Sequence, residues 1–260
     1  GLYEKAIVEE DAIDFDDMIG RAVDHISAGD YQPEHKHILV DEFQDISRGR
    51  AQLLNALKKG FDDSTLFCVG DDWQSIYRFA GSDVSVMREF QDYFGSAEVT
   101  KLDKTFRYND KICQFSAGFI QRNPIQISKD VATITYSDTP EVFFINGEKS
   151  ELDYVCSSLN HIKQSASKDA TVLLLGRYKK TVPPEMLDAV RKRFPDYRIE
   201  FKTVHSSKGL EFDYVIIPGL NSGSFGFPSM RVDDPVLGLV LPEAESFEHA
   251  EERRLFYVAC

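Results

Sequence analysis

The sequence is poor in cysteine, in long apolar runs and in net positive charge. Its four cysteines lie far apart, with no C-x-x-C pair and no histidine at ligand spacing, so neither a disulfide framework nor a zinc site is supported. No apolar run reaches about 18 residues, the length that spans a membrane, and the N-terminus lacks the pattern of a signal peptide. From these absences we expect a protein of a reducing compartment, cytoplasmic and without membrane contact.

The charge balance limits the ways in which this chain could bind nucleic acid. It has 30 basic and 43 acidic residues, a net charge of −13. A domain that holds DNA mainly by neutralising phosphates usually carries the opposite sign. Any nucleic-acid contact must therefore be local, made by a few arginines and aromatic residues in a groove.

Short apolar runs that end in polar residues or glycine predict an α/β fold with buried parallel strands. The predicted strands are residues 38–40, 66–69, 142–145, 172–175 and 214–217. Helical spacing of apolar residues predicts helices at 47–59, 87–94, 112–120 and 186–194. Ligands of open parallel sheets bind beyond the carboxyl ends of the strands, which is where this sequence places its polar residues.

The first predicted strand leads directly into two adjacent carboxylates, Asp41 and Glu42, in the stretch HILVDEFQD. One carboxylate can hold a hydrated Mg²⁺ against nucleotide phosphates. The other can orient or deprotonate an attacking water. An acidic pair at a strand end is often only a solvated turn, so the assignment needs support from the rest of the chain.

Four further stretches give that support: CVGDDWQSIYRFAGS at 68–82, LDKTFRYN at 102–109, TVHSSKGLEFDYVII at 203–217 and EERRLFYVA at 251–259. Together with VDEFQD, and in this order, they resemble the motifs of the UvrD/Rep family of superfamily 1 DNA helicases. The wording GDDWQSIYRF is similar to that of the helicase IV branch. The resemblance implies two RecA-like domains of the P-loop NTPase fold, with residues 1–103 the later part of the first and 104–260 most of the second.

The resemblance also implies ATP and Mg²⁺ as cofactors and assigns roles around the nucleotide. Asp41 would hold the magnesium ion through water, and Glu42 would activate the hydrolytic water. The amides of Gln44 and Gln74 would contact the γ-phosphate, and Arg107 would place a cation on it as charge develops. Glu42, Gln74 and Arg107 are therefore the expected catalytic residues.

Two more positions are assigned to the nucleotide by the same resemblance. Glu211 resembles the residue that binds the ribose. Arg254, in the last motif, is expected to contact ATP, although the charges of 251–254 would also suit ion pairs on a helix surface.

The DNA contacts that the resemblance implies fall in two stretches. Tyr77 and Phe79, with Arg78 between them, would stack on bases in a way that tolerates any sequence. The other stretch would touch the DNA backbone, through Thr203, His205 and Lys208. Trp73 is as well suited to a core as to a base.

The sequence contains no phosphate-binding loop of the form G-x-x-x-x-G-K-[ST], and it ends inside a motif. We therefore expect a fragment that by itself hydrolyses ATP poorly, taken from a monomeric motor that moves 3′ to 5′ on single-stranded DNA or a partial duplex. Repair or transcription proteins are expected partners. Two alternatives stay open: a non-motor module that binds DNA or RNA polymerase, and a magnesium nuclease.

Overall fold

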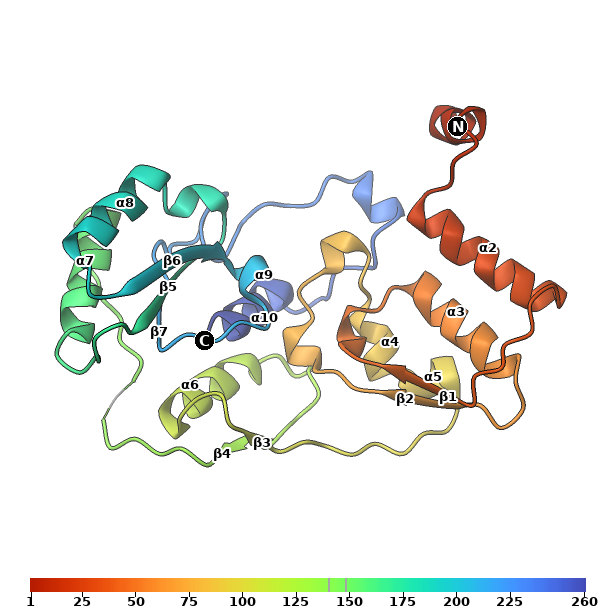
Figure 1. The fold of residues 1–260 in the computed structure, drawn as a ribbon, viewed down its shortest axis with the longest axis horizontal. Coiled ribbons are helices and arrows are strands. Elements are labelled where there is room, and N and C mark those ends of the chain that lie inside the picture. The colour runs from red at the N-terminus through yellow and green to blue at the C-terminus, as the bar shows by residue number, and fades with distance from the viewer. Residues whose placement is uncertain (140, 148) are drawn as a thin grey trace. The chain divides into compact units, whose positions relative to one another are not determined.

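The computed structural model describes residues 1–139, 141–147 and 149–260, which form two compact units (Figure 1). Unit 1 consists of Gly1–Val99 and Val236–Glu243, and unit 2 of Thr100–Pro235 and Ala244–Cys260. Both units combine helices with small parallel sheets, which confirms the predicted α/β class. The assignment of residues 1–103 and 104–260 to two RecA-like domains stays a prediction.

Unit 1 is built on two parallel strands, β1 (His37–Val40) and β2 (Thr65–Cys68). The helix between them, α3 (Arg48–Lys59), was expected from its apolar spacing; it begins after Ser47, whose side chain accepts a hydrogen bond from the Arg50 N–H, and it ends at Gly60. The other elements of the unit are α1 (Leu2–Glu9), α2 (Phe15–Ala28), η1 (Phe43–Asp45), η2 (Asp72–Gln74), η3 (Arg78–Ala80), α4 (Val84–Arg88), α5 (Phe90–Phe94) and η5 (Leu237–Leu239).

One face of the β1–β2 sheet carries the core of unit 1. Val40, Leu66 and Cys68 pack there against buried residues from η1, α3, α4 and α5. The other face is different, because Leu39 and Phe67 pair across the two strands and both are more than half exposed. The prediction that these strands are buried is therefore wrong for the face that carries Leu39 and Phe67, since in the described residues each strand has one neighbour and helices pack on a single face.

Unit 2 contains a three-stranded parallel sheet in the order β6 (Arg198–Thr203), β5 (Thr171–Gly176), β7 (Tyr214–Ile216). The central strand β5 is buried on both faces. Val172 and Leu174 point toward α7 (Glu151–Ile162) and α8 (Pro184–Arg193), whose apolar side chains complete the core. Figure 1 shows these two helices side by side along the sheet.

The other elements of unit 2 are β3 (Lys104–Thr105), α6 (Asp110–Ile120), β4 (Ala132–Thr133), η4 (Lys179–Thr181), α9 (Val204–Ser207) and α10 (Ala250–Ala259). β3 and β4 form a short parallel pair, and α6 and α10 are joined by edge-to-face contacts of Phe115 and Phe119 with Phe256.

Two expected elements differ from the structure, and one strand was not expected. Residues 142–145 form no strand, because Phe143 packs against His161 and Phe144 against Phe115, on helices rather than in a sheet. The expected helix at 87–94 is divided into α4 and α5 at Glu89. Strand β6 was not predicted, since its alternation of charged and apolar residues lacks a continuous apolar run.

Disulfide bonds and membrane-spanning segments were both expected to be absent. The four cysteines are free thiols there, two of them buried, and burial raises the pKa of the Cys68 and Cys260 thiols to about 12. No helix in the described ranges is both long enough and apolar enough to cross a bilayer.

Candidate functional site

The carboxyl ends of β1 and β2 meet at one edge of their sheet, and a short loop leaves each strand there. Backbone pairing continues past both ends, since the Val69 N–H donates to the Val40 carbonyl at 2.9 Å and the Phe43 N–H donates to the Val69 carbonyl at 2.8 Å. Asp41 and Glu42 lie between these two bonds and are both exposed. The backbone is thus fixed while the two carboxylates remain accessible.

Glu42 has a backbone conformation that its type rarely adopts. Its φ of 49° and ψ of 40° lie in the left-handed region, which non-glycine residues enter only occasionally. The side chain of Asp41 stabilises this turn, because its Oδ1 accepts a hydrogen bond from the Glu42 N–H at 2.8 Å. Such local strain is often found at functional sites.

The side chain of Gln44 connects the two strand-end loops. It is 1% exposed. Its Nε2 donates to the Glu42 carboxylate at 2.5 Å, and its Oε1 accepts from the Asp71 backbone N–H at 2.8 Å. The backbone carbonyl of Gln44 accepts a hydrogen bond from the Ser75 hydroxyl at 3.1 Å. A single amide therefore orients the Glu42 carboxylate and holds the loop after β2.

Gly70 allows this close approach of the two loops. A Cβ at position 70 would lie 2.7 Å from Gln44 Oε1 and 3.0 Å from the backbone nitrogens of Phe43 and Gln44. Because real Cβ contacts are longer, any other residue here would push the loops apart. Glycine is required at this point for space, not for an unusual φ.

Gln74 joins the same hydrogen-bonded group through Asp71. The Gln74 Nε2 donates to Asp71 Oδ2 at 2.8 Å, and Asp71 Oδ1 accepts from the Trp73 N–H at 3.0 Å. Asp71 was not predicted as a site residue, although its place after a predicted strand, in GDD, was a usable signal. Four predicted residues, Asp41, Glu42, Gln44 and Gln74, are thus connected through one junction, and we call these four with Asp71 the strand-end junction.

The aromatic pair that follows the junction lies in unit 1. The rings of Tyr77 and Phe79 meet edge to face with centroids 6.0 Å apart, and Phe79 is largely exposed. Arg78 donates to the Pro242 carbonyl at 3.1 Å. Trp73 is fully buried, which assigns it to the core. The exposed Phe79 ring offers a face on which a base could stack.

In unit 2, Arg107 and Glu211 form an ion pair across 104 residues of sequence. Arg107 Nε lies 3.0 Å from Glu211 Oε1, with the two side chains 49% and 66% exposed. The structure therefore brings together two residues that were predicted separately, one for the γ-phosphate and one for the ribose. Both are exposed enough to exchange this contact for a ligand.

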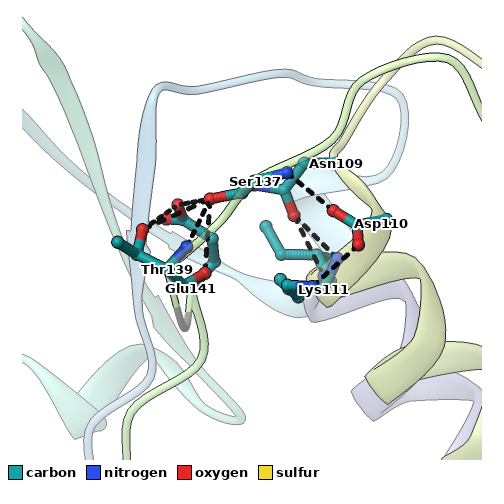
Figure 2. Close-up of polar contacts among 7 residues, drawn as sticks. Asn109, Asp110, Lys111, Ser137, Thr139 and Glu141 are labelled. Carbon is teal, nitrogen blue, oxygen red and sulfur yellow. Dashed lines mark hydrogen bonds and ion pairs between the residues drawn. The ribbon is translucent and has the colours of Figure 1, made fainter.

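Shortly after Arg107 in the sequence, polar contacts hold the start of α6, and Figure 2 shows those of Asn109, Asp110 and Lys111. The Asn109 side chain caps the helix by accepting from the Lys111 and Ile112 N–H groups, each at 3.1 Å. Asp110 accepts from the Ser137 N–H at 2.8 Å and from Lys111 Nζ at 3.0 Å. These bonds, the Ser137 bond first, lower the pKa of Asp110.

The predicted DNA-backbone residues lie at the end of β6 and in α9. Thr203 caps α9 by accepting from the Ser206 N–H at 3.3 Å. His205 and Lys208 are half-buried, within and just after this short helix. The sheet register pairs Thr203 with Gly176, so β5 and β6 end side by side.

Arg254 and Glu252 have structural partners in unit 2. Arg254 is 2% exposed, forms an ion pair with Glu245, and donates to Gln126 Oε1 at 3.0 Å. Glu252 Oε1 accepts from Arg177 Nε at 2.8 Å, and its Oε2 accepts from the Ser229 N–H at 2.9 Å. These are contacts with other segments, not ion pairs on a helix surface. The ATP contact of Arg254 stays a prediction.

The donor set of the strand-end junction fits a magnesium ion held by one carboxylate and water. Within the described ranges, no three His, Cys, Asp or Glu side chains gather into a metal-binding group. Mg²⁺ does not need such a cage, because it keeps several waters and uses one or two carboxylates with substrate phosphates. A polyphosphate near Asp41, Glu42 and Asp71 would also need a cation to offset their repulsion.

Comparison with known proteins gives consistent matches. Residues 1–95 match the model of the UvrD/REP helicase N-terminal domain, and residues 184–260 match that of the UvrD-like helicase C-terminal domain. The chain is 42% identical over 257 residues to DNA helicase IV of Escherichia coli K12, an alignment that covers 99% of this chain and 37% of the relative.

Two more distant relatives are also named as DNA helicases. The ATP-dependent DNA helicase Rep of Salmonella typhimurium is 26% identical over 80% of this chain and 32% of its own length. PcrA of Bacillus subtilis is 29% identical over 50% of this chain and 18% of its own length. The chain thus spans well under half of these relatives. Two domain models match in order, and one relative aligns with 99% of this chain, so the chain belongs to the UvrD/Rep-like family of DNA helicases.

Proposed function

We propose that this chain forms part of an ATP-driven motor that moves on single-stranded DNA, with the strand-end junction as the hydrolytic part of its ATP site. The observation that carries the proposal is the hydrogen-bonded connection from Asp41 and Glu42 through Gln44 to Asp71 and Gln74. It joins two exposed carboxylates to two amides at the carboxyl ends of parallel strands, where α/β folds bind their ligands.

Each junction residue has a role that its contacts support. Asp41 would hold a hydrated Mg²⁺, which supplies positive charge beside the phosphates. Glu42, oriented by the Gln44 amide, would take a proton from the attacking water. Gln74 would contact the γ-phosphate as a neutral hydrogen-bond donor, so that its bond to Asp71 is exchanged when nucleotide binds.

Unit 2 would supply the remaining nucleotide contacts. Arg107 would stabilise the charge that develops on the γ-phosphate, and Glu211 would accept hydrogen bonds from the ribose hydroxyls. Their mutual ion pair supports this, because it places a cation and an acceptor together on an accessible surface. Arg254 would contact ATP, held in place by Glu245 and Gln126.

The DNA contacts in this proposal are Tyr77, Arg78, Phe79, Thr203, His205 and Lys208. Stacking on the exposed Phe79 ring would hold bases without sequence preference. Sequence-independent stacking also suits a chain whose net charge is −13. Movement 3′ to 5′, a monomeric state and a cytoplasmic location belong to the same proposal.

The test is Glu42→Gln in a longer chain that joins these 260 residues to a phosphate-binding loop. DNA-stimulated ATP hydrolysis should fall by about a hundredfold or more, because the general base is lost, while ATP binding persists. Glu98→Gln, an exposed carboxylate in a loop of the same unit, is the matched control and should leave hydrolysis unchanged. Normal turnover by Glu42→Gln would contradict the proposal and favour a binding module without hydrolysis.

A further inference from the structure

A group of cationic and aromatic side chains surrounds Phe225 in unit 2, and none of its members has been given a role above. The Lys180 ammonium lies 3.0 Å from the centroid of the Phe225 ring, and the Arg231 guanidinium carbon lies 5.3 Å from it. The Tyr178 ring meets Phe225 edge to face with centroids 5.7 Å apart. Phe225 is nevertheless 54% exposed. We call these four residues the Phe225 cluster.

The cluster is held by two ordered segments. Tyr178 and Lys180 follow the carboxyl end of β5, and Phe225 and Arg231 belong to the loop 221–231. The Tyr178 hydroxyl lies 2.8 Å from the Ser229 hydroxyl, which connects the segments. The cluster is therefore built on a sheet edge and a braced loop.

The loop that carries Phe225 is closed by its own backbone. The Phe227 N–H donates to the Asn221 carbonyl at 3.0 Å, and the Met230 N–H donates to the Gly223 carbonyl at 2.9 Å. Gly226 fits inside this turn only because it lacks a Cβ, which would overlap the Asn221 carbonyl oxygen. Phe227 is buried and anchors the loop, whereas Phe225, two residues earlier, is exposed to solvent.

The chemistry of the cluster suits single-stranded nucleic acid. An exposed aromatic ring can stack on a base of any type, and adjacent cations can contact the flanking phosphates. In a chain with 13 more acidic than basic residues, Lys179, Lys180 and Arg231 are a local concentration of positive charge. Asp233 and Asp234 follow closely in the sequence, so the charge contribution is modest and the ring must carry much of the affinity.

The position of the cluster agrees with this chemistry. Gly176, the last residue of β5, pairs with Thr203, the last residue of β6. Residues that follow β5 therefore emerge at the same sheet edge as Thr203, His205 and Lys208, the proposed contacts with the DNA backbone. A DNA strand bound along those residues could continue to Phe225 without leaving unit 2.

We propose that Tyr178, Lys180, Phe225 and Arg231 form an additional contact for single-stranded DNA, in which a base stacks on Phe225 and Lys180 moves from the ring to a phosphate. This inference rests on the proposed function, since it extends the DNA path of the same motor. It adds a stacking position to the two proposed at Tyr77 and Phe79.

The test measures binding of a fluorescein-labelled oligo-dT by the 260-residue chain, using fluorescence anisotropy at several salt concentrations. Phe225→Ala should weaken binding about fivefold to tenfold, the loss of one stacked base, and Phe225→Tyr should restore it. Lys180→Gln should lower the slope of log affinity against log salt by about 0.7, the value for one phosphate contact on a single strand. An oligonucleotide with abasic sites should bind Phe225→Ala and the unchanged chain alike.

Two matched controls define a specific effect. Tyr136→Ala removes another exposed aromatic side chain of unit 2, and Lys192→Gln removes another exposed lysine, from α8. Tyr136→Ala should not weaken binding as Phe225→Ala does, and Lys192→Gln should not lower the salt slope as Lys180→Gln does. Thermal unfolding of each variant checks that Phe225→Ala remains folded, and Phe225→Leu, which keeps the apolar volume without the ring, should bind as weakly as Phe225→Ala.

The outcomes separate this inference from the proposed function. If oligo-dT binds, depends on Tyr77 and Phe79, and is indifferent to Phe225→Ala, the inference is overturned and the proposed function stands. If the chain binds no oligo-dT at micromolar concentrations, both fail. A labelled polyglutamate peptide that binds tightly and is weakened equally by Phe225→Ala would also overturn the inference, since it would assign the cluster to an acidic protein partner.

Discussion

The buried side-chain amide of Gln44 accepts a hydrogen bond from the backbone N–H of Asp71 at 2.8 Å, and this bond joins the loop after β1 to the loop after β2. The Gln44 amide is also the donor to the Glu42 carboxylate. The geometry of the proposed catalytic base therefore depends on a contact made on the neighbouring strand. Stability and activity should be coupled at this position.

Gln44→Leu tests this coupling. It keeps most of the side-chain volume but leaves the Asp71 N–H without its acceptor, so the free energy of unfolding should fall by about 1–3 kcal/mol. Gln52→Leu, an exposed glutamine on α3, should change it by no more than about 0.5 kcal/mol. Urea unfolding measures both. Equal stability of the two variants would show that the Gln44 bridge contributes nothing.

Gly70→Ala should lower the free energy of unfolding through steric overlap alone. The added methyl group would meet Gln44 Oε1 and two backbone nitrogens at 3.0 Å or less, and overpacking of this kind costs about 1–3 kcal/mol. Gly118→Ala is the matched control, because this glycine is exposed on α6 and a methyl group added there would have nothing within 4 Å. It should gain about 0.5–1 kcal/mol from helix propensity. Opposite shifts in melting temperature are expected, and a shift of the same sign would contradict the argument.

These contacts mark the limit of what the sequence could predict. Asp41, Glu42, Gln44 and Gln74 could be proposed as site residues because the motifs that contain them resemble those of a known family. The bridge from Gln44 to Asp71 could not, because it depends on the register of β1 against β2 and on a glycine that gives no local signal of close approach. The ion pair of Arg107 with Glu211 was hidden for a similar reason, since it joins positions far apart in the chain.

Adjacent arginines on α10 show the same limit. Arg253 and Arg254 look equivalent in the sequence, yet Arg254 is buried with Glu245 and Gln126 while Arg253 stacks on the Phe119 and Phe247 rings. Burial of a single position depends on the rotation of the helix about its axis and on loops that pack against it. Local pattern does not determine either.

Arg254→Met and Arg253→Met turn this contrast into a prediction. The first removes the buried cation that pairs with the largely buried Glu245 carboxylate and should lower the free energy of unfolding by about 3–5 kcal/mol. The second keeps the apolar contact with the rings and should cost about 1 kcal/mol or less. Denaturant unfolding compares them. If Arg254→Met unfolds like the unchanged chain, the arginine has no structural role and its proposed ATP contact gains weight.

Asp83 should make unit 1 sensitive to acid. Its burial alone would raise the pKa, but hydrogen bonds from Ser85 and from Arg48 Nε, at 2.7 Å, outweigh burial and hold the pKa of Asp83 below the ordinary 3.8. The folded state therefore binds this proton less readily than the unfolded state. The stabilisation is present above the unfolded pKa and is lost as the pH falls through the folded one.

Asp83→Asn should consequently be less stable than the unchanged chain at about pH 6, and the difference should shrink as the pH approaches about 3. Thermal unfolding across this range measures it. Asp92→Asn, which removes an exposed carboxylate on α5, is the control for net charge. A difference that stays constant with pH would mean that Asp83 acts through capping of α4 and not through its charge.

The ion pair between Arg107 and Glu211 separates stability from activity. Because both side chains are about half exposed or more, the pair should contribute only about 0–1 kcal/mol to folding. Arg107→Gln and Glu211→Gln should therefore melt close to the unchanged chain. In a longer chain with a phosphate-binding loop, Arg107→Gln should lower ATP hydrolysis about a thousandfold, the loss of an arginine on the γ-phosphate.

Glu211→Gln should act differently, because a ribose contact is made equally in the bound substrate and in the transition state. Losing it should raise KM for ATP and change kcat little. Arg122→Gln, which removes an exposed arginine of the same unit, is the control for net charge. If both site variants instead lowered the free energy of unfolding by several kcal/mol and left hydrolysis intact, the ion pair would be a structural contact and not part of the nucleotide site.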